Sequence, residues 1–191
     1  MRPVNREYRQ YLNAQLRRTL LKRSFTLPIR AKHFIDKCVE SIIPERSIVL
    51  CVGCRNSAEL DYFRDKSVQE VLGIDLQSEN QDILIMDMHA MTFPSESFDL
   101  VYSSHSLEHA HDPQQAVKEF LRVVRPGGVI AVEVPVDYDK ENPTSDLYDF
   151  ETLDNLLRLF NDYIARVLWQ ETDRPLDAGN DVIRVIIEIK K

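Results

Sequence analysis

The sequence has few cysteines, few glycines and no long apolar run. Three cysteines among 191 residues cannot build the disulfide framework of a small secreted domain, which agrees with a reducing compartment. The longest apolar stretches, such as 182–189, are interrupted by charge and too short to cross a bilayer, and no signal-peptide pattern opens the chain. No internal repeat or low-complexity linker occurs. We therefore expect a cytoplasmic protein that does not act with a membrane.

What the sequence does contain is enough apolar content for one core. Its 191 residues are 43% hydrophobic and 29% charged, which predicts a single folded domain rather than a disordered chain. The net charge of −7 is unevenly distributed. Residues 1–37 carry ten Lys or Arg against two acids, a charge of +8, whereas residues 38–191 carry 14 against 29, a charge of −15. This asymmetry divides the chain into a basic N-terminal extension, 1–37, and an acidic domain, 38–191.

The basic extension has apolar residues at roughly helical spacing, which predicts a helix. These residues are Tyr11, Leu12, Leu16, Leu20 and Leu21. Three interpretations remain open: a helix packed on the acidic domain, a cap over a pocket for an anionic substrate, or a contact between the two subunits of a homodimer. Nucleic acid is the weakest candidate partner, because the acidic domain would repel phosphates.

Apolar segments of strand length alternate with helical patterns beyond the extension. The expected strands are 48–52, 71–74, 83–86, 100–103, 129–134, 164–169 and 182–189. Helices are expected at 57–64, from Asp112-Pro113 to Val124, and near 150–160, with a turn at 125–128. This alternation predicts a doubly wound α/β sheet.

Two of the expected strands end on residues suited to a nucleoside. The first breaks at Gly53, and a glycine at a strand-to-helix turn lets the backbone approach a ligand closely. The second ends on Asp75, and an acid about 20 residues after such a glycine can accept hydrogen bonds from a ribose diol. The spacing favours an adenosine-containing cofactor.

Five segments in this order resemble the class I S-adenosylmethionine-dependent methyltransferases. They are 48–54, 73–75, 86–89 with Phe93-Pro94, 98–109 and 125–128, and the resemblance covers roughly residues 45–191. It implies a Rossmann-like sheet of seven strands with the last one antiparallel, in three αβα layers. On this basis residues 38–191 are a methyltransferase-like domain that acts on a small-molecule or sugar-linked acceptor.

The resemblance also implies S-adenosyl-L-methionine as the cofactor and assigns roles by position. Gly53 would lie beneath the methionine part of the cofactor, and Ser104 would contact its aminoacyl end. Asp75, with Leu76 beside it, would hold the ribose. Asp87 and the backbone of Met88 would contact the adenine. The chain departs from the family where Cys51 replaces an acid and Arg55 replaces a glycine. We interpret Arg55 as a ligand of the cofactor's carboxylate. The alternative is a binding or scaffold protein that has kept the fold and lost catalysis.

A neutral oxygen or nitrogen acceptor would need a base, and His105 and His109 leave the fourth strand at the cofactor edge. They could instead be loop histidines that bond backbone groups. Glu133 and Asp137, at the exit of the fifth strand, are candidates for positioning the substrate.

Two other motifs compete with this interpretation. His105, Glu108 and His109 form an H-x-x-E-H pattern, which in a zinc hydrolase holds the metal on one helix face. A new helix starts at Asp112-Pro113, however, so no long helix is available, and we predict no metal site. Cys51 and Cys54 form a C-x-x-C, but Cys51 falls inside a strand, which favours a buried packing role over redox chemistry.

Overall fold

The computed structural model describes residues 8–11, 13, 26–78, 80–136, 146–173 and 181–191. Most of the basic extension lies outside these residues, so the structure does not address the predicted leucine stripe at Leu12, Leu16, Leu20 and Leu21, or a homodimer formed through it. Asp137 also lies outside the described residues.

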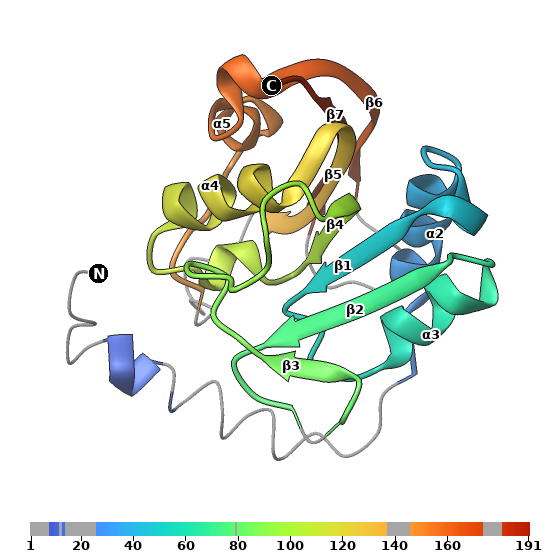
Figure 1. Cartoon of the computed structure of the whole chain (residues 1–191). Coiled ribbons are helices and arrows are strands. Elements are labelled where there is room, and N and C mark those ends of the chain that lie inside the picture. The colour runs from blue at the N-terminus through green and yellow to red at the C-terminus, as the bar shows by residue number, and fades with distance from the viewer. Residues whose placement is uncertain (1–7, 12, 14–25, 79, 137–145, 174–180) are drawn as a thin grey trace.

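One seven-stranded sheet organises the domain (Figure 1). Its strands are β1 (Ile48–Val52), β2 (Glu70–Asp75), β3 (Ile83–Ile85), β4 (Phe98–Ser104), β5 (Val124–Val136), β6 (Ile164–Asp173) and β7 (Asp181–Ile189). The spatial order is β3-β2-β1-β4-β5-β7-β6, and β7 runs antiparallel to both of its neighbours while β1 to β5 are parallel. The predicted seven-stranded sheet with an antiparallel final strand is confirmed.

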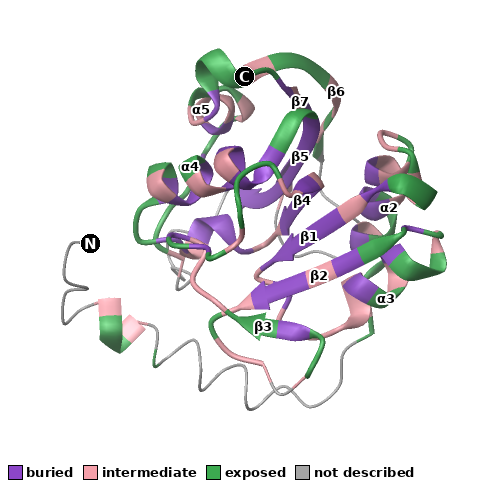
Figure 2. Cartoon of the chain, in the orientation of Figure 1, coloured by how far each residue is buried: buried purple, intermediate pink, exposed green. Residues whose placement is uncertain are grey.

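Helices cover both faces of the sheet, because successive side chains of β1 point to opposite faces and are apolar on both. Val49 and Cys51 pack under α2 (Ile29–Val39) and α3 (Ala58–Asp65). Leu50 and Val52 belong to the opposite cluster, with α4 (Pro113–Val123) and α5 (Leu153–Arg158). Because every β1 residue after the first is buried, the strand is apolar throughout. Figure 2 shows this buried interior between helices whose outer sides are exposed, so the three-layer architecture is confirmed.

Local capping fixes the start of α4. The Asp112 side chain accepts a hydrogen bond from the Gln115 backbone N–H at 3.0 Å, and Pro113 occupies the first helical position. The helix ends at Val123, and β5 begins directly at Val124. The turn predicted at 125–128 lies inside β5 instead of before it: Phe98 of β4 pairs with Val124 and Leu100 pairs with Val129, so residues 125–128 bulge out opposite Asp99, and Gly127 has a φ of +71°.

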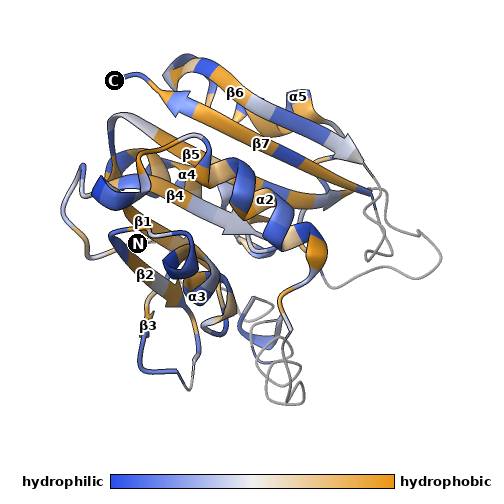
Figure 3. Cartoon of the chain, turned by 90° about the vertical axis from the view of Figure 1, so that its right-hand side faces the viewer, coloured by the Kyte–Doolittle hydropathy of each residue, from blue (hydrophilic) through white to orange (hydrophobic). Residues whose placement is uncertain are grey.

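Apolar residues are concentrated in the strands, whereas the outward side of α2 is hydrophilic (Figure 3). Within the described ranges, no helix combines the length and the apolar character that a bilayer span requires.

Candidate functional site

A cavity opens at the carboxyl ends of β1, β2 and β4, where ligands bind in open α/β sheets. Eight of the ten predicted site residues line it: Gly53, Arg55, Asp75, Leu76, Asp87, Met88, His105 and His109. Ser104 lines a neighbouring cavity, and Cys51 is fully buried in the core and lines neither. The structure therefore brings together most of the residues that the sequence separates by up to 56 positions.

Gly53 is required by its neighbour Ser106. Its φ is +75°, and a Cβ at this position would lie 2.3 Å from Ser106 Cβ. Ser106 Oγ in turn lies within hydrogen-bond distance of the Val52 carbonyl, at 2.9 Å, and of Ser103 Oγ, at 2.7 Å. The sequence suggested a collision with the cofactor, whereas the structure shows that the glycine first allows the ends of β1 and β4 to meet.

Asp75 ends β2 and fixes the loop after β1. One carboxylate oxygen accepts a hydrogen bond from the Arg55 backbone N–H at 3.0 Å, and the other accepts from the Gln77 backbone N–H at 3.1 Å. Each carboxylate oxygen has a second lone pair, so both remain able to accept from a ligand. Arg55 itself has a φ of +39°, a backbone conformation that favours glycine.

Histidines near Asp87 form part of the site that sequence reasoning missed. Asp87 Oδ1 lies 2.6 Å from His89 Nδ1 and accepts from the His89 backbone N–H at 2.9 Å. Burial alone would raise the pKa of Asp87, but these contacts outweigh it and lower that pKa. The centroid of the His89 ring lies 3.8 Å from that of His111, with the rings tilted by 39°, and the pKa of His111 is lowered by burial and by His89. In the sequence, the two-residue spacing of Asp87 and His89 was the signal that could have identified His89 as a site residue.

Two tyrosines from the N-terminal extension also line the cavity. Tyr11 Oη lies 2.7 Å from His109 Nδ1, and the Tyr8 ring lies 4.5 Å from the ring of His111. Burial raises the pKa of Tyr8 to about 12. This placement agrees with a cap over a pocket, although no charged group of the extension is involved in these contacts.

The neighbouring cavity is more strongly charged. It shares Gly53, Arg55, His105 and His109 with the first cavity and adds charged or polar side chains, namely Arg30, Glu59, Ser104, Glu108 and Asp146. Burial raises the pKa of Glu59 to about 8, against a hydrogen bond from the Tyr102 hydroxyl. The two cavities meet at the four shared residues.

Glu133 anchors an ionic network behind His105. Its carboxylate is fully buried and contacts Arg30 at 2.5 Å, Arg184 at 2.5 Å and His105 Nε2 at 3.2 Å, and it accepts a hydrogen bond from Ser104 Oγ at 2.9 Å. Burial alone would raise the pKa of Glu133, but His105 and the two arginines together lower it to about 2. The suggestion that Glu133 positions the substrate is corrected: it lines neither cavity and holds the residues that do.

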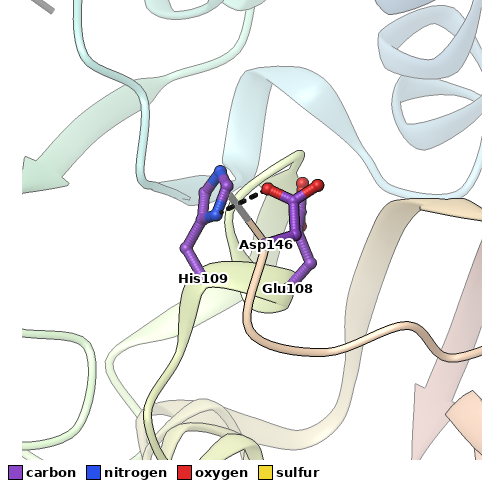
Figure 4. A group of neighbouring side chains, drawn as sticks. All are labelled: Glu108, His109 and Asp146. Carbon is purple, nitrogen blue, oxygen red and sulfur yellow. Dashed lines mark ion pairs between the residues drawn. The ribbon is translucent and has the colours of Figure 1, made fainter. Parts of the chain in front are cut away.

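The H-x-x-E-H segment does not form one helix face. Residues Leu107–His109 make a single 3₁₀ turn, and His105 precedes it with a φ of +49°. His105 contacts Glu133, whereas His109 Nδ1 lies 3.0 Å from Asp146 Oδ1 (Figure 4). Burial lowers the pKa of His109, but Asp146 and Glu108 outweigh burial and raise it. The paired-histidine geometry of a zinc hydrolase is therefore absent from this described segment.

The cysteines are packing residues. Cys38, Cys51 and Cys54 are free and buried, and burial raises the pKa of each thiol. Since the thiolate is the reactive form, the C-x-x-C has no activated nucleophile, which supports the predicted packing role of Cys51.

Residues 50–132 match the family model described as "Methyltransferase domain". Among curated relatives, a sterol 24-C-methyltransferase of Eremothecium gossypii is 30% identical over 132 residues, which cover 64% of this chain and 35% of that protein. A ubiquinone/menaquinone biosynthesis C-methyltransferase of Stenotrophomonas maltophilia is 33% identical over 127 residues, which cover 63% of this chain and 46% of that protein. The chain thus spans less than half the length of these relatives.

Solved structures share the fold. A SAM-dependent methyltransferase from Aquifex aeolicus has a TM-score of 0.61 at 17% identity, covering 85% of this chain and 93% of that one. The [4+2]-cyclase SpnF has a TM-score of 0.65 at 15% identity, covering 83% and 81%. The sheet order, the family match over residues 50–132 and the curated relatives together make this chain similar to the class I S-adenosylmethionine-dependent methyltransferases.

Proposed function

We propose that the chain binds S-adenosyl-L-methionine in the first cavity and transfers its methyl group to a small-molecule or sugar-linked acceptor in the second. One observation carries the proposal. Asp75 at the end of β2, Asp87 in the loop after β3 and the turn at Gly53 all line the same cavity. The free cysteines support a reducing, cytoplasmic setting.

The donors and acceptors of the cavity fit such a cofactor. Asp75 and Asp87 offer carboxylate oxygens to hydroxyl and amino groups, and Leu76 and Met88 offer apolar surface to a base. When bound, the cofactor supplies an electrophilic methyl group, so the protein has to align the acceptor and exclude water. Gly53, Arg55, His105 and His109 occupy the boundary where the two cavities meet.

The charge of the second cavity favours a polar acceptor. Arg30, Glu59, Glu108 and Asp146 line it, and an apolar ring system would displace water from these polar groups without offering them hydrogen bonds. The relatives named for sterol and for quinone biosynthesis therefore suggest the reaction type more than the acceptor. A hydroxyl-rich or sugar-linked acceptor matches these side chains better.

A catalytically silent binding protein is the second candidate. The same fold occurs in a protein named as a [4+2]-cyclase, and this chain has Cys51 and Arg55 where the family usually has an acid and a glycine. Cofactor binding alone would not exclude this candidate, whereas methyl transfer to any acceptor would.

Titration of the full chain with S-adenosylhomocysteine, the demethylated cofactor, tests the proposed site. We expect saturable binding by calorimetry and a rise in the melting temperature that grows with ligand concentration. Replacing Arg55 with Ala should weaken this binding about tenfold, because a charged hydrogen bond contributes roughly 1.5 kcal/mol or more. If the wild-type chain shows no binding, the proposal is wrong. If Arg55→Ala binds more tightly, Arg55 blocks the cavity instead of holding the ligand.

His105 is the favoured base for an acceptor that must lose a proton. Its Nε2 lies 3.2 Å from the Glu133 carboxylate, its Nδ1 lies 3.6 Å from the Glu108 carboxylate, and the residue lines both cavities. We expect His105→Ala to lower methyl transfer at least a hundredfold while the affinity for S-adenosylhomocysteine changes less than threefold. Unchanged turnover would remove His105 from the mechanism.

A further inference from the structure

Glu108, His109 and Asp146 form a cluster of potential metal ligands in the wall of the second cavity. One ligand atom from each residue lies within 4.8 Å of the other two. Glu108 and His109 come from the 3₁₀ turn after β4, and Asp146 comes from the segment before α5. Figure 4 shows the imidazole and the two carboxylates gathered at one point.

The Glu108 carboxylate is incompletely satisfied. Its side chain is 1% exposed, and its Oε2 has no hydrogen-bond partner among the described residues. The other oxygen lies 3.6 Å from His105 Nδ1, which is beyond a normal hydrogen bond. A buried carboxylate oxygen without a partner costs free energy, and burial raises the pKa of Glu108 accordingly. Either a proton or a bound cation would remove this cost.

The spacing of the other two ligands suits a cation. His109 Nδ1 and Asp146 Oδ1 are 3.0 Å apart. Two ligand atoms that each lie about 2.1 Å from a metal ion are separated by about 3.0 Å at a right angle and by about 3.4 Å in a tetrahedral site, so this contact would lengthen by a few tenths of an ångström for Zn²⁺. The Tyr11 hydroxyl, 2.7 Å from the same His109 nitrogen, is the group that an ion at this nitrogen would displace.

The donor set also indicates which ions fit. One imidazole nitrogen and two carboxylates give a charge of about −2 and suit Zn²⁺ or Mn²⁺ better than Mg²⁺, which prefers oxygen ligands alone. Arg55 lines the same cavity, and its positive charge opposes the net rise in the pKa of His109, so it would also reduce the affinity for a cation.

We propose that Glu108, His109 and Asp146 bind a divalent transition-metal ion at the wall of the second cavity. Three protein ligands leave coordination positions open, and Glu108, His109 and Asp146 all line this cavity. Oxygen atoms of a polar acceptor can fill those positions. This last step rests on the proposed function, whereas binding of the ion does not.

Calorimetric titration of the full chain with Zn²⁺ or Mn²⁺, without cofactor or acceptor, tests the site. We expect one ion per chain. Glu108→Gln and Asp146→Asn keep the shape of each side chain and remove one charged ligand, so each should weaken binding at least tenfold. Glu70→Gln is the matched control, because Glu70 is exposed at the opposite end of β2, and it should leave the affinity unchanged.

Thermal unfolding of each variant shows whether it is folded under the conditions of the titration. The proposal is overturned if neither ion binds the wild-type chain, which would assign the Glu108 carboxylate a proton. It is also overturned if folded Glu108→Gln and Asp146→Asn both retain wild-type affinity, which would locate the ion elsewhere. Binding of S-adenosylhomocysteine is measured separately, so a failure of the cofactor site and a failure of the metal site give different results.

Discussion

Replacing Asp75 with Ala should weaken the binding of S-adenosylhomocysteine about a hundredfold, a loss of about 3 kcal/mol. Asp75 lines the cavity at the end of β2, where a carboxylate can accept both hydroxyls of a ribose. The substitution also removes the acceptor for the backbone N–H groups of Arg55 and Gln77. Both effects act on the same loop, and calorimetry on the purified chain measures their sum.

Two further variants make this result interpretable. Asp75→Asn keeps an oxygen for the backbone contacts but lacks the charge, so an intermediate loss would separate loop shape from ribose recognition. Asp65→Ala removes an exposed acid from the end of α3 and should leave the affinity unchanged. An Asp75→Ala chain that binds with wild-type affinity would contradict both the ribose role and the location of the cofactor.

The sheet could be predicted because its residues carry a clear local signal. The strands β1 and β4 are buried on both faces, so they appear as apolar runs, and the Asp112-Pro113 cap marks the start of α4. The bulge at 125–128 could not be predicted in the same way. Asp99 lies opposite the bulge, accepts a hydrogen bond from the Ile48 backbone N–H at 2.7 Å and pairs with Arg125, and such long-range pairing leaves no periodic pattern.

The candidate site likewise contains residues with a local sequence signal and residues whose role depends on long-range contacts. Gly53, Asp75 and Asp87 could be identified because each ends or follows a strand at the carboxyl edge of the sheet. Asp146 was missed, since it reaches His109 from a segment that is remote in sequence and has no motif of its own. Tyr11 was noticed only as part of a helical pattern, which does not reveal that its hydroxyl lies 2.7 Å from His109 Nδ1. Glu133 was noticed but misinterpreted, because its position at the end of a strand does not reveal that two arginines from α2 and β7 cover it.

Replacing Glu133 with Gln should lower the free energy of unfolding at pH 7 by roughly 3 kcal/mol, because it leaves Arg184, 2% exposed, and Arg30 without their shared carboxylate. Glu188→Gln is the matched control. Glu188 pairs with the exposed Arg166 at 2.6 Å on the same sheet, and a surface pair of this kind contributes about 1 kcal/mol or less. Urea unfolding of both variants measures the difference, and equal losses would contradict a structural role for the buried network.

The difference between wild type and Glu133→Gln should also depend on pH in a fixed direction. The pKa of Glu133 is lowered from 4.5 to about 2 in the folded chain, chiefly because His105, Arg30 and Arg184 outweigh the effect of burial. A carboxyl group whose pKa is lower in the folded than in the unfolded state stabilises the fold. This contribution is fully present above the unfolded-state pKa and is lost as the pH falls toward the folded-state pKa. The gap should therefore stay constant from pH 7 to about 5.5 and shrink as the pH falls below about 4.5. A gap that widens under acid would mean that Glu133 is stabilised in its protonated form, and the ionic network would then have no part in holding His105 at the boundary between the two cavities.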